Sequence, residues 1–264
     1  MRNPDATTVP ATQAAPMLSI VIPVLNEAQG ITQVLQALAP LRARGVQVIV
    51  VDGGSTDDTL ERARKLLQDS ASSTTYAGLE SDAAIAHADT LAWQVISAPS
   101  GRAVQMNAGA QQARGATLLF LHADTHLPAA ADTLVARALN RGTQHWGRFD
   151  VRIAGQHSML RVIAELMNRR SRLSGIATGD QAMFMSRAAY DAVGGFPAQP
   201  LMEDVEMSKR LLRLSRPACL RAQVVTSGRR WETHGVWRTV LLMWRLRWAY
   251  WRGASPERLA RLYR

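Results

Sequence analysis

Cysteine and long apolar runs are the scarcest features of this 264-residue chain. Its one cysteine, Cys219, excludes an intrachain disulfide and a cysteine-ligated zinc site, which fits a reducing compartment such as the cytoplasm. No stretch reaches 18 consecutive apolar residues, and the best candidate, 236–251, is interrupted by arginines. Residues 1–16 lack the apolar core of a signal peptide, so we expect a flexible N-terminal tail. These absences predict a protein without a membrane-spanning helix.

Positive charge is concentrated near the C-terminus. The formal net charge is +10, and residues 205–264 hold fourteen basic residues against three acidic ones, a net of +11. Residues 1–204 are therefore near neutral, at −1. Proteins that coat nucleic acid normally spread basic residues along the whole binding face. We therefore expect no nucleic-acid partner and a different role for the basic C-terminal quarter.

Short apolar, β-branched runs alternate with segments of helical spacing in the first half of the chain. The expected strands are 18–22, 46–51, 94–97 and 117–121, and the expected helices are 27–41, 56–67 and 102–113. This alternation predicts an α/β fold with a mostly parallel sheet covered by helices on both faces. Residues 70–92 interrupt it as a surface insertion. The second half is less regular, with expected strands at 149–153 (half-exposed) and 182–186, and helices at 159–173, 203–214 and 236–252.

Polar residues follow the expected strands at their carboxyl ends, where open α/β sheets bind ligands. They come from four separate segments: Asn26 and Glu27, 52–57, Arg102 and Asn107, and His122 and Asp124. Two common phosphate-binding loops are absent, because neither G-x-G-x-x-G nor G-x-x-x-x-G-K-[ST] occurs at these turns. A nucleotide bound here would need a metal ion or arginines to neutralise its phosphates.

Seven motifs occur in an order that is typical of one enzyme family. They read SIVIPVLNE at 19–27, VVDGGSTD at 50–57, LFLHADT at 119–125, GDQAMF at 179–184, GGFP at 194–197, EDVEM at 203–207 and RRW at 229–231. Together they resemble the family 2 glycosyltransferases, which implies the GT-A fold with its Rossmann-like sheet. GRAVQMN at 101–107, GDQ and RRW are most similar to the subgroup labelled as arsenosugar-biosynthesis glycosyltransferases.

The resemblance covers residues 17–235 and implies two halves within one domain. Residues 17–126 would bind the nucleotide, and residues 127–235 would contact the acceptor. Residues 236–264 would add basic amphipathic helices at the C-terminus. The implied activity is metal-dependent transfer of a sugar, with inversion, from a nucleotide-diphosphate sugar to an acceptor that the motifs leave open.

The resemblance implies a donor pocket at the ends of the first three strands. Asp52 would hold the uracil or the ribose of the donor, with Pro23 beside it. Asp52 and Asn26 each have a structural alternative, because aspartate caps Gly-Gly turns and asparagine caps helices. The full set expected on this side is Pro23, Asn26, Glu27, Asp52, Gly53, Ser55, Asp57, Asn107 and His122.

Asp124 matches the metal-binding aspartate of the family's D-x-D element. A carboxylate suits Mn²⁺ or Mg²⁺, which would bridge the two phosphates of the leaving nucleotide diphosphate. His122 stands where the first aspartate of that element usually lies. We expect His122 to bond a ribose or phosphate, and contact between its imidazole and the metal is the alternative.

Asp204 matches the family's catalytic base, in a motif that begins with Glu203. Displacement with inversion needs a base near the acceptor hydroxyl, opposite the leaving group. The alternative is that both acids only stabilise the start of a helix. Asp180 lies in a glycine-flanked loop and would contact the acceptor or the donor sugar, or else be a plain turn aspartate.

Three arginines and one tryptophan complete the implied site. Arg102, Arg229 and Arg230 would pair with the diphosphate, because guanidinium groups match phosphate oxygens. Trp231 would stack on a sugar ring. For each arginine the alternative is a solvated charge, since arginine is the chain's predominant basic residue.

Arginines also mark the last expected helix, 236–252. Arg238, Arg245 and Arg252 are spaced by seven and fall on one stripe beside a wide apolar arc with tryptophans. This pattern is typical of a helix lying in a membrane surface, here the inner face of the cytoplasmic membrane. Packing on the catalytic domain or on a second copy of the chain is the alternative.

Two other classes of protein stay open at this stage. A sugar-phosphate nucleotidyltransferase shares the α/β architecture, but its glycine-rich first turn with arginine and lysine is absent. A non-catalytic nucleotide-sensing or membrane scaffold protein would keep the pocket and lose the chemistry. Slow hydrolysis of nucleotide sugars would separate an enzyme from such a scaffold.

Overall fold

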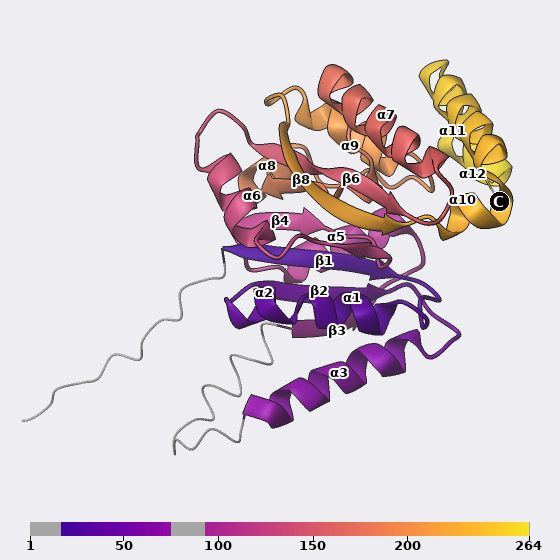
Figure 1. Cartoon of the computed structure of the whole chain (residues 1–264). Helices are drawn as coiled ribbons and strands as arrows, with labels where there is room; N and C mark the ends of the chain where they lie inside the picture. The colour runs from indigo at the N-terminus through magenta and orange to yellow at the C-terminus, as the bar shows by residue number, and fades with distance from the viewer. Residues whose placement is uncertain (1–16, 75–92, 264) are drawn as a thin grey trace, which may run out of the picture.

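The computed structural model describes residues 17–74 and 93–263, with side chains from 67 to 74 left aside. The expected tail at 1–16 and most of the expected insertion at 70–92 lie outside this part of the chain. Its centre is an eight-stranded sheet in the order β3-β2-β1-β4-β7-β6-β8-β5 (Figure 1). The strands are β1 (Leu18–Val24), β2 (Gln47–Asp52), β3 (Trp93–Ser97), β4 (Thr117–Phe120), β5 (Thr125–His126), β6 (Trp146–Ala154), β7 (Phe184–Ser186) and β8 (Ala218–Ser227).

The first half of the sheet is parallel, as the alternating sequence pattern predicted. β1 pairs parallel with both β2 and β4, and β2 pairs parallel with β3. The helices are α1 (Ile31–Ala37), α2 (Ala39–Ala43), α3 (Thr59–Thr74), α5 (Arg102–Gln112), α6 (Ala131–Leu139), α7 (Met159–Ser174), α8 (Arg187–Ala192), α9 (Glu203–Leu211), α10 (Arg229–His234), α11 (Val236–Trp251) and α12 (Pro256–Tyr263). A short 3-10 turn, η1, covers Gly179–Gln181.

Helices bury both faces of this sheet. Ile20 and Ile22 of β1 join a core cluster with α1, α6 and α7, whereas Val21 joins a second cluster with α5, α8 and α9. Each of these three side chains is fully buried, which contributes about 1.5–3 kcal/mol apiece to folding. The predicted α/β fold with a doubly covered sheet is therefore confirmed.

The second half of the sheet is mixed, and one expectation about it is wrong. β6 pairs antiparallel with β7 and parallel with β8, so it lies inside the sheet and only Arg152 is exposed. The half-exposed strand expected at 149–153 is thus a buried strand. β8 was not expected, because Arg221 and Gln223 interrupt its apolar pattern.

The helix expected at 27–41 is two shorter helices. Pro40 lies in the first turn of α2 and lacks the N–H that a continuous helix would need. The residues before α1 form a loop in which Asn26 adopts φ +56°, and Gly30 takes the N-cap position. The alternative role of Asn26 as the cap of this helix is therefore wrong.

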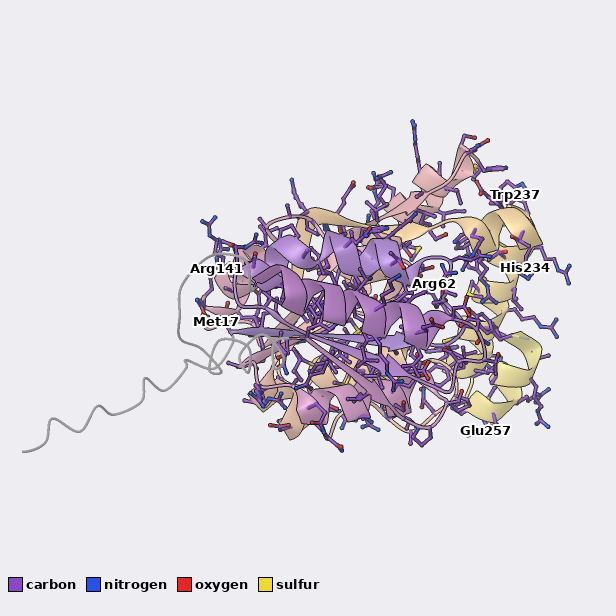
Figure 2. The ribbon with its side chains drawn as sticks, turned by 90° about the horizontal axis from the view of Figure 1, so that it is seen from below. Met17, Arg62, Arg141, His234, Trp237 and Glu257 are labelled. Carbon is purple, nitrogen blue, oxygen red and sulfur yellow. The ribbon has the colours of Figure 1, made fainter. Side chains whose placement is uncertain are left out.

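The C-terminal helices lie at the end of the sheet to which the parallel strands point. In Figure 2, Met17, just before β1, lies at one end of the molecule, and His234 and Glu257 lie at the other. Leu259 of α12 and Leu246 of α11 are buried against Met202, at the start of α9. Within residues 17–74 and 93–263, no helix is both long and apolar enough to cross a membrane.

Candidate active site

A small pocket lies beyond the end of β4 and the start of β7. Arg102, His122, Glu203 and Asp204 line it, together with Gly179 and four apolar side chains, Met106, Phe120, Met183 and Phe196. These groups come from α5, the β4–β5 turn, η1 and α9. The structure therefore brings together two residues expected on the donor side, Arg102 and His122, and two expected in catalysis, Glu203 and Asp204.

Asp204 is held at the start of α9 by backbone N–H groups. Its Oδ2 accepts a hydrogen bond of 2.9 Å from Gly179, and its Oδ1 accepts one of 2.7 Å from Val205. Met202, at φ +64°, turns the chain sharply into the helix. These donors fix the direction of the carboxylate and leave it acceptor capacity toward the pocket.

Glu203 lies beside Asp204 but is almost fully buried, with 3% of its surface exposed. Burial and the neighbouring charge of Asp204 raise the pKa of Glu203. Arg102 opposes that rise from 3.5 Å. The two adjacent acids thus have different environments, because Glu203 is buried whereas Asp204 is half-buried.

His122 contacts η1. Its Nδ1 lies 3.2 Å from Oδ1 of Asp180, and its Nε2 is buried without a hydrogen-bond partner among the described residues. A Cβ added to Gly179 would overlap Nε2, so glycine is required there. Because a carboxylate only accepts hydrogen bonds, Nδ1 of His122 is the donor in this pair. In this structure Nδ1 of His122 faces Asp180 and Nε2 lies against Gly179.

Asp180 is the residue that His122 stabilises. Desolvation opposes ionisation, but the hydrogen bond from His122 and the charges of His122, Arg102 and Arg247 hold the pKa of Asp180 below its usual range. The turn is closed by two hydrogen bonds: Thr178 N–H donates to Gln181 Oε1 at 3.3 Å, and Gln181 N–H donates to the Thr178 carbonyl at 2.9 Å. Asp180 is therefore a fixed, ionised carboxylate near Asp204.

The expected donor residues after β1 and β2 brace two loops against each other. Asn26 N–H donates to Ser55 Oγ at 3.0 Å, and Thr56 N–H donates to Asn26 Oδ1 at 2.9 Å. Asp57 accepts from Ala28 N–H at 3.2 Å. In this structure Ser55, Asp57 and the Asn26 amide position the loops that would surround a nucleotide.

Asp52 is buried at the end of β2. Its carboxylate accepts from the N–H groups of Gly54 (3.1 Å) and Ser55 (3.2 Å), which is the turn-capping arrangement. Gln105 of α5, which the sequence did not single out, donates to the carbonyls of Val24 and Val51 at 2.8 Å each. Gln105 packs so closely on Gly53 that no Cβ fits there, so α5 fixes the ends of β1 and β2.

Asp124 and Glu27 form a second acidic pair at the strand ends. Burial and the charge of Asp124 raise the pKa of Glu27, and Arg229 at 3.6 Å partly opposes this. Among the described residues, no three His, Cys, Asp or Glu side chains gather as a metal site. One or two carboxylates are nonetheless what Mg²⁺ or Mn²⁺ takes when substrate phosphates supply the other ligands. The donor set at Asp124 fits such an ion.

The remaining expected residues have protein partners. The guanidinium of Arg230 stacks on the Tyr263 ring at 3.8 Å, and Trp231 packs against the core cluster on the α1 face of the sheet. Asn107 does not line the pocket. Its Nδ2 donates to the Phe196 carbonyl, and its Oδ1 accepts from the Phe196 N–H, at 2.9 Å each. Asn107 therefore positions Phe196, which does line the pocket.

The sheet, covered by helices on both faces and with carboxylates at its strand ends, has the architecture of the GT-A glycosyltransferases. The chain belongs to the family described as Glycosyl transferase family 2, whose sequence profile matches residues 19–194. It is similar to the PGL/p-HBAD biosynthesis glycosyltransferase of Mycobacterium bovis, with 37% identity over 46% of this chain and 40% of that protein. It is also similar to Glycosyltransferase AglE of Haloferax volcanii, with 33% identity over 43% and 32% of the two chains.

Solved structures show the same fold. The mannosyltransferase PcManGT from Pyrobaculum calidifontis, solved with GDP-Man and Mn²⁺, superposes with a TM-score of 0.60 at 20% identity, over 95% of this chain and 70% of that one. TarS residues 1–349 of S. aureus, solved with UDP, superposes with a TM-score of 0.59 at 20% identity, over 80% and 60%. The chain spans less than half the length of the curated relatives it matches.

Proposed function

We propose that the protein is an inverting glycosyltransferase that moves a sugar from a nucleotide-diphosphate sugar to an acceptor hydroxyl, with Asp204 as the base. The observation that carries the proposal is the Asp204 carboxylate, which backbone N–H groups hold at the wall of the pocket. Family membership and the ligands printed for similar structures, UDP and GDP-Man, support the donor class.

The proposed reaction needs little more than position and one proton acceptor. The acceptor oxygen attacks the anomeric carbon and forms the new glycosidic bond. The bond from that carbon to the donor phosphate breaks, and the nucleoside diphosphate leaves. The acceptor proton passes to Asp204, whose carboxylate is already aimed by Gly179 and Val205 and needs no reorganisation.

Residues 17–126 form the donor side in this proposal, and residues 127–235 form the acceptor side. Asp52 and the loops braced by Asn26 would hold the base and the ribose. Asp124, with Glu27 beside it, would hold Mn²⁺ or Mg²⁺, which supplies positive charge to the leaving diphosphate. Arg102 lies at the pocket and half-exposed, so it is available to the phosphates as well as to Glu203.

Release of free nucleotide tests the proposal. The protein is incubated with UDP- and GDP-sugars and Mn²⁺, and the UDP or GDP formed is measured without any acceptor. We expect slow, Mn²⁺-dependent hydrolysis of one donor, and loss of that hydrolysis with Asp204→Asn while donor binding persists. Binding of no nucleotide sugar, or hydrolysis unchanged by Asp204→Asn, would overturn the proposal.

A further inference from the structure

One face of α11 is apolar and uncovered. Trp237, Leu241, Trp244, Trp248 and Trp251 follow one another at spacings of four and three residues, so they share a stripe. Their side chains are between 59% and 77% exposed. Figure 2 shows Trp237 at the outer edge of the molecule. Large exposed apolar patches of this kind mark surfaces that contact an apolar partner.

An open groove separates the middle of this stripe from α7. Arg170 of α7 lines it on one side, and Trp244, Arg245, Arg247 and Trp248 of α11 line it on the other. Nε and Nη2 of Arg170 are buried, yet they make no hydrogen bond with any residue that the structure describes. Buried, charged donors without an acceptor are unfavourable, so this guanidinium lacks an anionic partner.

Arg247 adds a second guanidinium without a carboxylate partner in the described part of the chain. Burial and the charge of Arg247 lower the pKa of Arg170 to about 10. Burial also lowers the pKa of Arg247, while Asp204 and Asp180 oppose that change. Leu246 of α11, next to Arg247, is buried with Met202 at the start of α9. The part of α11 that lines the groove therefore lies close to the helix end that carries Asp204.

Charge identifies the kind of molecule that would fill the groove. α11 carries three arginines and no acidic residue, so a second copy docked on the same face would place arginine against arginine. An anion satisfies Arg170 and Arg247, and an alkyl chain covers the neighbouring tryptophans. One molecule that does both is an anionic amphiphile.

We propose that the groove between α7 and α11 binds the acceptor, and that the acceptor is a lipid-like anionic amphiphile. Its anionic group contacts Arg170 and Arg247, and its apolar part lies over Trp244 and Trp248. Its nucleophilic hydroxyl then lies beside Asp204. This inference rests on the proposed function, because it names the acceptor class of the same site.

Calorimetry with dodecyl phosphate below its micelle concentration tests this binding. We expect saturable binding that exceeds that of inorganic phosphate, which lacks the chain, and of dodecyl maltoside, which lacks the anion. Arg170→Gln should weaken binding about tenfold to hundredfold, as loss of a charge-assisted contact does. Arg161→Gln, an exposed arginine on the same helix, should leave it unchanged. Trp244→Ala should weaken it, and Trp237→Ala, on the stripe outside the groove, should not.

Three results would overturn the inference. The first is inorganic phosphate binding as tightly as dodecyl phosphate, and the second is dodecyl maltoside doing so. The third is an Arg170→Gln variant that binds dodecyl phosphate as tightly as the unaltered protein. Nucleotide binding with Mn²⁺, measured on the same samples, confirms that each variant is folded. It also separates the two proposals. A protein that binds the amphiphile but no nucleotide contradicts the proposed glycosyltransferase function. A protein that binds nucleotide but no amphiphile contradicts only the proposed acceptor class.

Discussion

The backbone N–H of Gly179 donates a 2.9 Å hydrogen bond to Oδ2 of Asp204, which joins η1 to the first turn of α9. Gly179 also packs directly on the His122 ring, and His122 pairs with Asp180. One short turn therefore positions the proposed base and an ionised neighbour together. Changes in this turn should reach the chemistry without any direct contact with substrate.

Asp204→Asn should lower turnover by about a hundredfold to ten-thousandfold, the usual contribution of a positioned general base. The asparagine side chain keeps the size and the hydrogen bond from Gly179, so donor binding should persist. Steady-state kinetics and calorimetry with the donor measure the two effects. Glu206→Gln is the matched control, because Glu206 lies in the same turn and pairs with Lys209 and Arg210 at 3.6 Å each.

Gly179→Ala should lower both stability and turnover, because the added methyl group displaces the His122 ring. Overpacking of this kind costs about 1–3 kcal/mol of unfolding free energy. The combined variant His122→Ala with Gly179→Ala should be no worse than His122→Ala alone, since the clash is then absent. Urea unfolding and kcat/KM of the three variants provide the measurement. Losses that simply add would show that Gly179 acts independently of His122.

Asp124→Asn should weaken binding of a nucleoside diphosphate in the presence of Mn²⁺ by roughly tenfold to a hundredfold, because a charged ligand to the ion is lost. Without Mn²⁺ the variant and the unaltered protein should bind alike. Calorimetry with and without the ion measures the difference. Asp132→Asn is the control. Asp132 lies on α6, outside the pocket, and pairs with Arg44 at 2.7 Å. If Mn²⁺ strengthens nucleotide binding equally in both variants, Asp124 is not a ligand of the ion.

The sequence predicts the parallel half of the fold well, because each of its strands is a short apolar run that needs no distant information. The same pattern of apolar residues does not predict β8 or the break between α1 and α2. In β8, Arg221 lies at a bulge in the pairing with β6, and Gln223 pairs with Asp150 of β6, which is far away in the chain. At 27–41 the helical spacing of the apolar residues continues across Pro40, although proline breaks a continuous helix.

In the candidate site, too, the sequence predicts the residues that belong to motifs and misses the contacts between distant segments. The motifs predicted that Arg102, His122, Glu203 and Asp204 would belong to one site, and the structure places all four on one pocket. They did not predict the brace at Gln105 or the groove at Arg170, because each depends on side chains from segments more than fifty residues apart.

Asp150→Asn should destabilise the protein by about 3–5 kcal/mol, because it leaves a buried charge without its partner. The side chain of Arg148 is fully buried and pairs with Asp150, while its Nε and Nη2 bond Ser171 and Asn168. Urea unfolding measures the loss. Glu165→Gln removes the exposed pair with Arg169 on α7 and should change stability by no more than about 0.5 kcal/mol. Equal effects would mean that the buried pair contributes no more than a surface one.

Glu203→Gln should change how stability depends on pH. The pKa of Glu203 is raised above 4.5 by burial and by Asp204, so the folded state binds a proton more readily than the unfolded chain does. The stability that this proton gives is full below about pH 4.5 and is lost as pH rises through the folded pKa. Glutamine carries no such penalty, so the variant should gain stability relative to the unaltered protein as pH rises from 4 to 7. Urea unfolding across that range measures the difference, and a difference that falls with pH would mean that the ion pair with Arg102 outweighs burial.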